Sequence, residues 1–356
     1  MEVEKGRKVK ERDSNIELFR IVTMLLIVAH HYVVNSGLLL PIIENYPSTK
    51  SIFLLLFGWG GKTGINCFVL ITGYFMCTSA ITLRKALKLF LEVEFYNVIF
   101  YFIFVATGYI EISLKSLIVG LVPISSIKYD FVSCYLVFFC FIPFLNILIN
   151  GMNQKQHLIL VGLCLLIYTI FPLMLIPIFF SYLSWFMVIY LIAAYLRLYP
   201  PLWSLDKKIV GWGMLFCLVL SMTSVIIGGW LSIIYNKRLF YFFVSDSNKP
   251  FAVVTAVFAF LFFKNLNIRY SKIINMIAAS TFGVLLIHAN CEAMRQWLWR
   301  ETFDNVGHYS GNIYLHAILS VIVVYVVCTI IDYCRIKVLE NYIFRLIDNK
   351  IENNGK

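Results

Sequence analysis

Long apolar blocks recur over the whole chain, and they limit the possible fold more than any other feature of the sequence. Each block approaches the roughly 20 apolar residues that a helix needs to cross a bilayer. The chain is 60% hydrophobic and only 14% charged, whereas soluble domains are about 25% charged. The sequence therefore predicts an all-α, polytopic membrane helix bundle. Its ten predicted spans are residues 17–39, 63–80, 87–108, 131–149, 157–177, 180–198, 209–234, 251–264, 273–291 and 313–334.

The predicted spans form a single membrane domain over residues 14–334. Residues 1–13 form a short charged tail, and residues 335–356 have the amphipathic pattern of a helix on the inner membrane surface. The apolar stretch Ser51–Gly58 is followed by the interruption "GWGGK", so we expect an interfacial or re-entrant lead-in to the second span. No small-residue cleavage site follows the first apolar block, which favours a retained helix over a signal peptide.

The net charge of +11 follows from the positive-inside rule better than from nucleic-acid binding. The basic residues are scattered between apolar blocks instead of clustering on one soluble face. With ten spans and the N-terminus inside, most of the 30 lysine and arginine residues lie on the cytoplasmic side. The smaller group on the outer side includes Lys62. We therefore expect both termini to be cytoplasmic.

The nine cysteines are predicted to be small buried residues. Almost all lie within apolar blocks, no two have CxxC spacing, and none clusters with histidines. The sequence therefore predicts neither a disulfide framework nor a bound metal.

Two ionisable residues share one face of the first predicted helix. Arg20 and His31 are separated by three turns plus about 20°, at 100° per residue, and by about 16 Å along the axis. Ionisable residues within spans usually face the bundle interior and mark functional sites, so His31 is the main candidate for chemistry. His30 points roughly 100° away. The alternatives are a structural histidine between helices and an arginine that snorkels to the inner headgroups.

Other polar residues within the spans are weaker candidates. His288, near the outer end of the ninth span, could converge with His31 and bind substrate. Asn66 and Tyr74 in the second span could hydrogen-bond a substrate. Each of the three could instead tie helices together.

The acidic residues within the spans need partners. Glu17 lies three residues before Arg20, and Glu92 lies four residues after Lys88, so local ion pairs are the first expectation. The alternative is that Glu92 or Glu94 orients a catalytic imidazole.

Several segments follow one another in a recognisable order. In "NIELFRIVTMLLIVAHHY" a basic residue, ten residues and then a histidine occur, a spacing that Arg20 and His31 satisfy and His30 does not. "GINCFVLITGYFM", "LRKALKLFLEVEFYN", "LSWFMVIYLIAAYLRLY" and "TFGVLLIHANCEAMRQWLW" follow it. Together these segments resemble the acyltransferase-3 family of integral membrane acyltransferases, most closely the branch that acetylates bacterial surface polysaccharides. The resemblance covers nearly the whole chain.

The resemblance implies transfer of an acyl group, usually acetyl from acetyl-CoA, to a carbohydrate hydroxyl at the bacterial plasma membrane. It implies catalytic roles for His31 and Arg20. Such a reaction needs a base near the hydroxyl, and histidine suits this because its unperturbed pKa is near neutrality. His31 is then either the general base or a nucleophile that carries the acetyl group transiently. The sequence leaves both roles open.

The phosphates of the donor would arrive from the cytoplasm, where Arg84 and Lys88 share one helix face at the inner end of the third span. The alternative is ordinary positive-inside flanking. The family often has two arginines here, whereas this chain has one arginine and lysines, which makes bidentate binding of phosphate harder. The expected partners are a carbohydrate acceptor, membrane lipid and polysaccharide assembly proteins, and not nucleic acid.

Two other functions fit a chain of this composition. A transporter or flippase for a sugar-containing substrate would also have many spans and intramembrane charges, but many such proteins have inverted repeats, and none is visible here. A structural subunit of a polysaccharide synthesis complex would not depend on His31.

Overall fold

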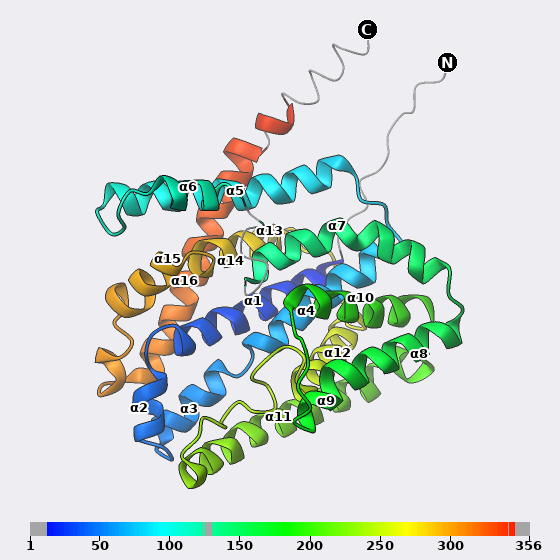
Figure 1. Ribbon diagram of the computed structural model, residues 1–356, viewed down its shortest axis with the longest axis horizontal. Coiled ribbons are helices and arrows are strands. Elements are labelled where there is room, and N and C mark those ends of the chain that lie inside the picture. Colours follow the sequence, from blue (N-terminus) through cyan, green and yellow to red (C-terminus); the bar gives the residue numbers. More distant parts are fainter. Residues whose placement is uncertain (1–12, 123, 125–129, 341, 346–356) are drawn as a thin grey trace.

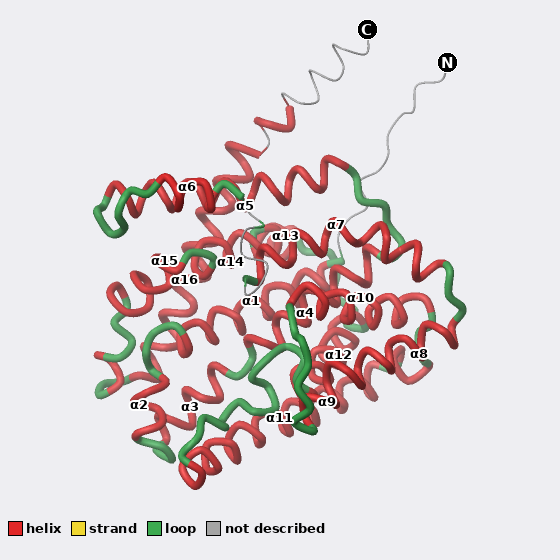
Figure 2. The backbone as a smooth tube through the Cα atoms, in the orientation of Figure 1, coloured by secondary structure: helices red, strands yellow, loops and turns green. Residues whose placement is uncertain are grey.

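The computed structural model describes residues 13–122, 124, 130–340 and 342–345, and every regular element in this part of the chain is helical (Figures 1 and 2). The α-helices are α1 (Ser14–Val34), α2 (Leu39–Glu44), α3 (Thr49–Gly58), α4 (Gly61–Met76), α5 (Leu83–Ala106), α6 (Leu114–Gly120), α7 (Phe131–Asn150), α8 (Gln154–Leu165), α9 (Phe171–Leu173), α10 (Tyr182–Leu198), α11 (Lys207–Tyr235), α12 (Pro250–Lys264), α13 (Lys272–Ala279), α14 (Thr281–Ala289), α15 (Glu292–Gln296) and α16 (Ile313–Arg335). Short π- or 3₁₀-helical segments are η1 (Leu166–Ile170), η2 (Leu202–Leu205), η3 (Trp297–Thr302), η4 (Gly307–Tyr309) and η5 (Ile336–Glu340).

The predicted spans correspond to helical segments one by one. Two of them are the shorter apolar helices α10 and α12. The all-α polytopic bundle is therefore confirmed, whereas the number of crossings and the cytoplasmic position of the termini stay predictions. Residues 1–12 and 346–356, which include nearly all of the first predicted tail and half of the second, lie outside the described residues. Within the described part, eight segments are long and apolar enough to cross a membrane, namely Ser14–Val34, Thr49–Met76, Leu83–Ala106, Phe131–Asn150, Gln154–Leu173, Lys207–Tyr235, Lys272–Ala289 and Ile313–Arg345.

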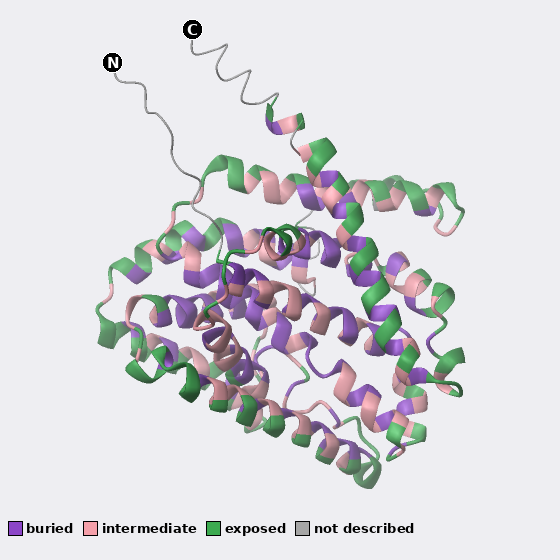
Figure 3. Cartoon of the chain, turned by 180° about the vertical axis from the view of Figure 1, so that it is seen from behind, coloured by how far each residue is buried: buried purple, intermediate pink, exposed green. Residues whose placement is uncertain are grey.

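The outer faces of the peripheral helices are apolar and exposed. On α11, Trp212, Phe216 and Ile234 expose about two thirds or more of their surface, and Figure 3 shows exposed residues along the outside of the bundle with buried ones at its centre. A contiguous apolar surface of this extent is not stable in water, whereas lipid covers it without cost. These faces identify the bundle as a multi-pass membrane protein.

Helix α1 is the central element of the bundle (Figure 1). It contacts α3, α4, α12, α13, α14 and α16, and Met24, Val28 and Tyr32 along it are fully buried. Close packing on one side of α1 depends on glycines. A Cβ atom at Gly61 would overlap the ring of His30, and one at Gly64 would lie 2.8 Å from Ile27. His30 of α1 is therefore packed directly against the backbone of α4.

Helix α3 and helix α4 form one helical segment that is interrupted at a single point. The expected interfacial or re-entrant lead-in Ser51–Gly58 is helical, and only Trp59 and Gly60 separate α3 from α4. Ser48 begins α3 by accepting a hydrogen bond from the amide of Ser51. Lys62, which the charge count places on the outer side, lies in the first turn of α4.

Helices α10 and α12 are short because irregular chain occupies part of the path of each span. The cap residue Ser181 begins α10, and Pro250 at the first position begins α12. The segment 236–249 before α12 enters the bundle, since the Tyr241 hydroxyl donates to the carbonyl of Leu55 on α3 at 2.9 Å. Irregular backbone at this depth is tolerated because protein groups satisfy its hydrogen bonds.

A buried ion-pair network joins α5 to α16. Arg335 lies 2.9 Å from Glu92 and 2.8 Å from Asp332, and the Tyr96 hydroxyl donates to Asp332 at 2.8 Å. The expected local pair of Glu92 with Lys88 is therefore wrong, because Glu92 pairs across helices. The sequence could not show this, since Arg335 follows Glu92 by more than 200 residues.

We predict that Arg335→Met strongly destabilises the protein, because it leaves Glu92 and Asp332 buried without their cation. Breaking a buried pair in this way costs about 3–5 kcal/mol. The measurement is the thermal unfolding midpoint in detergent, with the exposed Arg269→Met as control. Equal midpoints for the two variants would contradict the role given to this network.

Candidate active site

The structure brings His31 and His288 together from helices that are far apart in the sequence. His31 lies in the last turn of α1, and His288 lies in the last turn of α14. The Nδ1 atom of His31 is 3.0 Å from the Nε2 atom of His288, and their ring centroids are 5.1 Å apart. His288 is fully buried, whereas His31 is partly exposed. The predicted convergence of the two histidines is thus observed.

The hydrogen bonds of His288 determine which nitrogen of His31 is left unprotonated. The Nδ1 atom of His288 lies 2.5 Å from the carbonyl oxygen of Val284, and a carbonyl can only accept. In neutral His288 the proton is therefore on Nδ1 and Nε2 carries a lone pair. His31 must then donate from Nδ1, so its Nε2 carries the lone pair. No described residue hydrogen-bonds this nitrogen, which makes it available as a base or nucleophile.

His30 has a structural partner instead. Its Nδ1 atom lies 2.6 Å from the carbonyl oxygen of Gly58, the last residue of α3. The final carbonyls of a helix lack partners within that helix, so His30 satisfies one of them at the break before α4. His30 thereby fixes the position of this break next to His31.

Two positive charges lie near the histidine pair. Lys62 on α4 directly follows Gly61, whose backbone packs against the ring of His30. Arg295 on α15 donates to the carbonyl of Ala289, the residue after His288, at 2.7 Å and pairs with Glu292. The hydrogen bond from Arg295 lowers the pKa of the Glu292 carboxyl, which lies outside the spans. Neither His31 nor His288 has a carboxylate partner among the described residues.

Arg20 lies on the same unbroken helix as His31, toward its other end. Its Nε atom is 3.5 Å from Glu17, so the expected local pair is confirmed. No hydrogen bond joins Arg20 to His31, as their predicted separation along the helix requires.

Both the nitrogen and the oxygen of the Asn66 side-chain amide form hydrogen bonds within the protein. Its nitrogen donates to the carbonyl of Ser247 at 2.7 Å, and its oxygen accepts from the indole of Trp185 at 2.9 Å. Asn66 is fully buried and forms no hydrogen bond with either histidine. It ties α4, α10 and the segment 236–249 together.

Tyr74 lies near the opposite end of α4 from Lys62. Its hydroxyl accepts from Arg197 at 3.0 Å, and the cations of Arg197 and Lys264 lie 4.7 and 5.7 Å from its ring centre. The structure therefore does not bring Tyr74 to the histidine pair, and places it among basic residues at the ends of α10 and α12.

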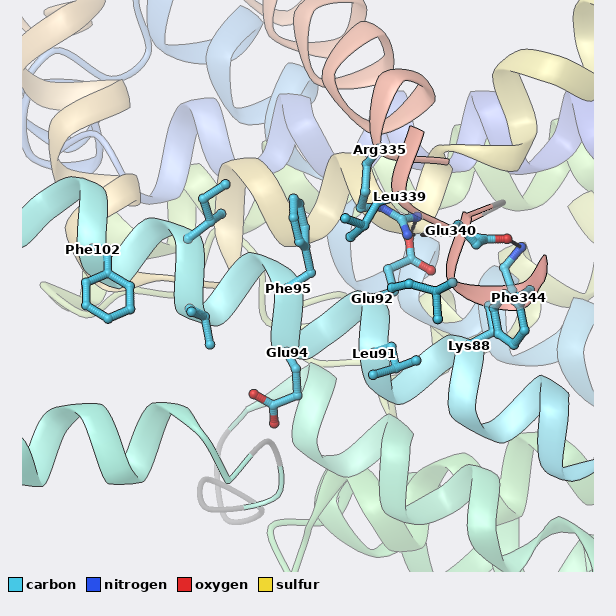
Figure 4. Close-up of a pocket in the computed structure, with 13 residues that line it drawn as sticks. Lys88, Leu91, Glu92, Glu94, Phe95, Phe102, Arg335, Leu339, Glu340 and Phe344 are labelled. Carbon is cyan, nitrogen blue, oxygen red and sulfur yellow. Dashed lines mark hydrogen bonds and ion pairs between the residues drawn. The ribbon is translucent and has the colours of Figure 1, made fainter. Parts of the chain in front are cut away.

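The two residues expected to bind the donor phosphates, Lys88 and Arg84, contact the segment that follows α16, here called the C-terminal segment. Lys88 lies 2.6 Å from Glu340, and the Arg84 guanidinium lies 4.8 Å from the ring centre of Phe344. Figure 4 shows Lys88 and Glu340 facing each other beside a cavity between α5 and this segment, which has a volume of about 460 Å³. An incoming phosphate would have to compete with Glu340 for Lys88.

A second cavity adjoins the histidine pair. It has a volume of about 640 Å³, within the range of small-molecule pockets, and His288 forms part of its wall. The other walls come mainly from apolar residues of α5, η3 and α16, among them Phe104, Trp297 and Val327. An apolar group beside His288 would be accommodated there.

Three residues that form a cluster around the start of α4 were not predicted from the sequence as site residues, namely Lys62, Tyr182 and Asp246. The ammonium of Lys62 hydrogen-bonds the Tyr182 hydroxyl, which donates to Asp246 at 3.2 Å. The lysine within the glycine-rich "GWGGK" was a usable signal, because it directly precedes an apolar block. Nothing local marks Tyr182 or Asp246.

The fold and this histidine pair define a polytopic membrane protein whose candidate active site lies inside the helix bundle. The sequence matches the model of the acyltransferase-3 family, described as an acyltransferase domain, over residues 13–333. The chain therefore belongs to this family, and it is a membrane acyltransferase. No curated protein and no solved structure matches it.

We predict that His288→Ala lowers the acyl-transfer rate about 100-fold, because His31 loses the acceptor that selects its tautomer. His288→Gln should recover part of the rate, since its amide oxygen can accept from His31 Nδ1. The measurement is kcat of the purified protein, with the exposed His308→Ala as control. Equal rates for His288→Ala and the wild type would contradict this positioning role.

Proposed function

We propose that the protein moves an acetyl group from cytoplasmic acetyl-CoA to a hydroxyl of a cell-surface polysaccharide or its lipid-linked precursor in the bacterial plasma membrane. The observation that carries the proposal is the hydrogen-bond chain from Val284 through His288 to His31. It leaves one imidazole nitrogen unprotonated and accessible inside a membrane acyltransferase. Polysaccharide assembly proteins are the expected partners.

The chemistry follows from the free nitrogen of His31. The acceptor hydroxyl gives its proton to His31 Nε2 while its oxygen attacks the thioester carbon, and the carbonyl electrons move onto the carbonyl oxygen. When the carbonyl reforms, the carbon–sulfur bond breaks and the CoA thiolate takes the proton from His31. One thioester and one alcohol thus become one ester and one thiol. The hydrogen bond to His288 holds the ring through both proton transfers.

Two features support the direction of transfer. Arg84 and Lys88 lie at the start of α5, the expected cytoplasmic end, where they would bind the donor phosphates. His31 lies toward the other end of the bundle, where a sugar hydroxyl would reach it. Arg20 would either anchor α1 at the inner surface or meet a donor phosphate. Asn66 and Tyr74 would act by holding the helices around the substrates.

The direct test is transfer of labelled acetyl from acetyl-CoA to surface polysaccharide by the purified protein in lipid nanodiscs. His31→Ala should abolish transfer, because no other described group supplies a free imidazole nitrogen at this position. His30→Ala should keep measurable transfer, since His30 serves the helix break. Full acetylation by His31→Ala would reject the proposal.

The same labelled donor separates the two roles of His31. Rapid quenching without acceptor should give no label on the protein if His31 is a general base, and label on His31 if it is a nucleophile.

We predict that Arg84→Ala raises the KM for acetyl-CoA about tenfold, the size expected for one lost hydrogen bond to a charged group. Glu340→Gln should lower this KM, because it releases Lys88 from its ion pair. The matched control is Lys85→Ala, which changes the neighbouring exposed lysine. If Arg84→Ala and Lys85→Ala leave the KM equally unchanged, the donor phosphates bind elsewhere.

A further inference from the structure

Lys62 lies beside the histidines although it belongs to another helix. It is the second residue of α4, directly after Gly61, whose backbone packs against the ring of His30. It lies thirteen positions after Thr49, the start of α3, along mainly helical chain, which corresponds to about 20 Å at 1.5 Å per residue. A lysine this far within a span is costly and usually serves a function.

Two side chains from different elements hold the Lys62 ammonium. It hydrogen-bonds the hydroxyl of Tyr182, at the start of α10, and its Nζ atom lies 3.8 Å from Asp246. The hydroxyl of Tyr182 donates to the same carboxylate oxygen of Asp246, at 3.2 Å. Tyr182 therefore links the cation to its counter-ion.

The segment that carries Asp246 is fixed within the bundle. Asn66 on α4 binds the carbonyl of Ser247 at 2.7 Å, and Asn248 donates to the carbonyl of Tyr168 at 2.7 Å. The backbone amide of Ser247 donates to the Asp246 carboxylate at 2.7 Å. The counter-ion of Lys62 is thus set in place independently of Lys62 itself.

The Lys62 ammonium has more N–H donors than the described residues accept hydrogen bonds from. An ammonium has three N–H donors, and among the described residues the Tyr182 hydroxyl is the one acceptor within hydrogen-bond distance. A pair that served only to join helices would bring the ammonium and the carboxylate into direct contact, as Arg335 and Glu92 do at 2.9 Å. Lys62 also retains 25% exposure of its side chain. A substrate group can therefore reach it.

From these contacts we infer that Lys62 is a further catalytic residue, which donates a hydrogen bond to the carbonyl oxygen of the acyl thioester as that oxygen gains negative charge. The inference rests on the proposed acyl transfer. His31 Nε2 takes the hydroxyl proton, and Lys62 stabilises the oxyanion without giving up a proton. The oxyanion then collapses to the ester as the CoA thiolate leaves. Tyr182 and Asp246 are positioning residues, because they act through Lys62.

The test compares Lys62→Met and Lys62→Gln with the wild type in the labelled acetyl-CoA assay. Loss of one oxyanion donor costs about 10²–10³ in kcat, and the KM for acetyl-CoA should change little, since the hydrogen bond strengthens as the charge develops. Lys62→Gln keeps a donor for Tyr182, so it decides the question if Lys62→Met fails to fold. Tyr182→Phe should lower kcat less than either variant. Lys249→Met, a nearby lysine outside the cluster, is the control and should keep the wild-type rate.

The outcomes separate this inference from the proposed function. A wild-type kcat in Lys62→Gln, with transfer lost in His31→Ala, would overturn only the role of Lys62. A loss that appears in KM alone would also overturn it, because it would indicate ground-state binding. Failure of the wild type to transfer any acyl group would overturn both.

Discussion

The hydrogen bond from His31 to His288 is the interaction on which the rest of the site depends. Either ring alone could carry its proton on either nitrogen, and neither would then present a defined base. Because the carbonyl of Val284 fixes the proton of His288, the pair has one arrangement when neutral, with a lone pair on His31 Nε2. The chemistry of the site thus follows from one backbone carbonyl on α14.

Two further contacts fix the surroundings of this pair. His30 satisfies the end of α3 at Gly58, and the glycine at position 61 lets α4 approach α1 without a gap. In a membrane, unpaired polar groups cost several kcal/mol each. An arrangement of the helices that broke the hydrogen bond of His30 would therefore be unfavourable. The broken segment α3–α4 thereby places Lys62 in the first turn of α4, with 25% of its side chain exposed.

The sequence predicted the helices well because apolar length is a local property. All ten apolar blocks correspond to helices, and the face shared by Arg20 and His31 follows from the continuity of α1. Contacts between distant residues could not be predicted in this way. Glu92 pairs with Arg335 and not with Lys88, and Asp246 reaches Lys62 only because the segment 236–249 enters the bundle. No local sequence pattern indicates that this segment enters the bundle.

The most direct measurement of the central claim is the protonation of His31 itself. Nitrogen-15 NMR of the protein with labelled histidine, assigned by loss of signal in His31→Ala, reports which ring nitrogen carries hydrogen. The account predicts a protonated Nδ1, hydrogen-bonded to Nε2 of His288, and an unprotonated Nε2 at neutral pH. A proton on His31 Nε2, or on both nitrogens, would contradict it, since no lone pair would then face the substrates.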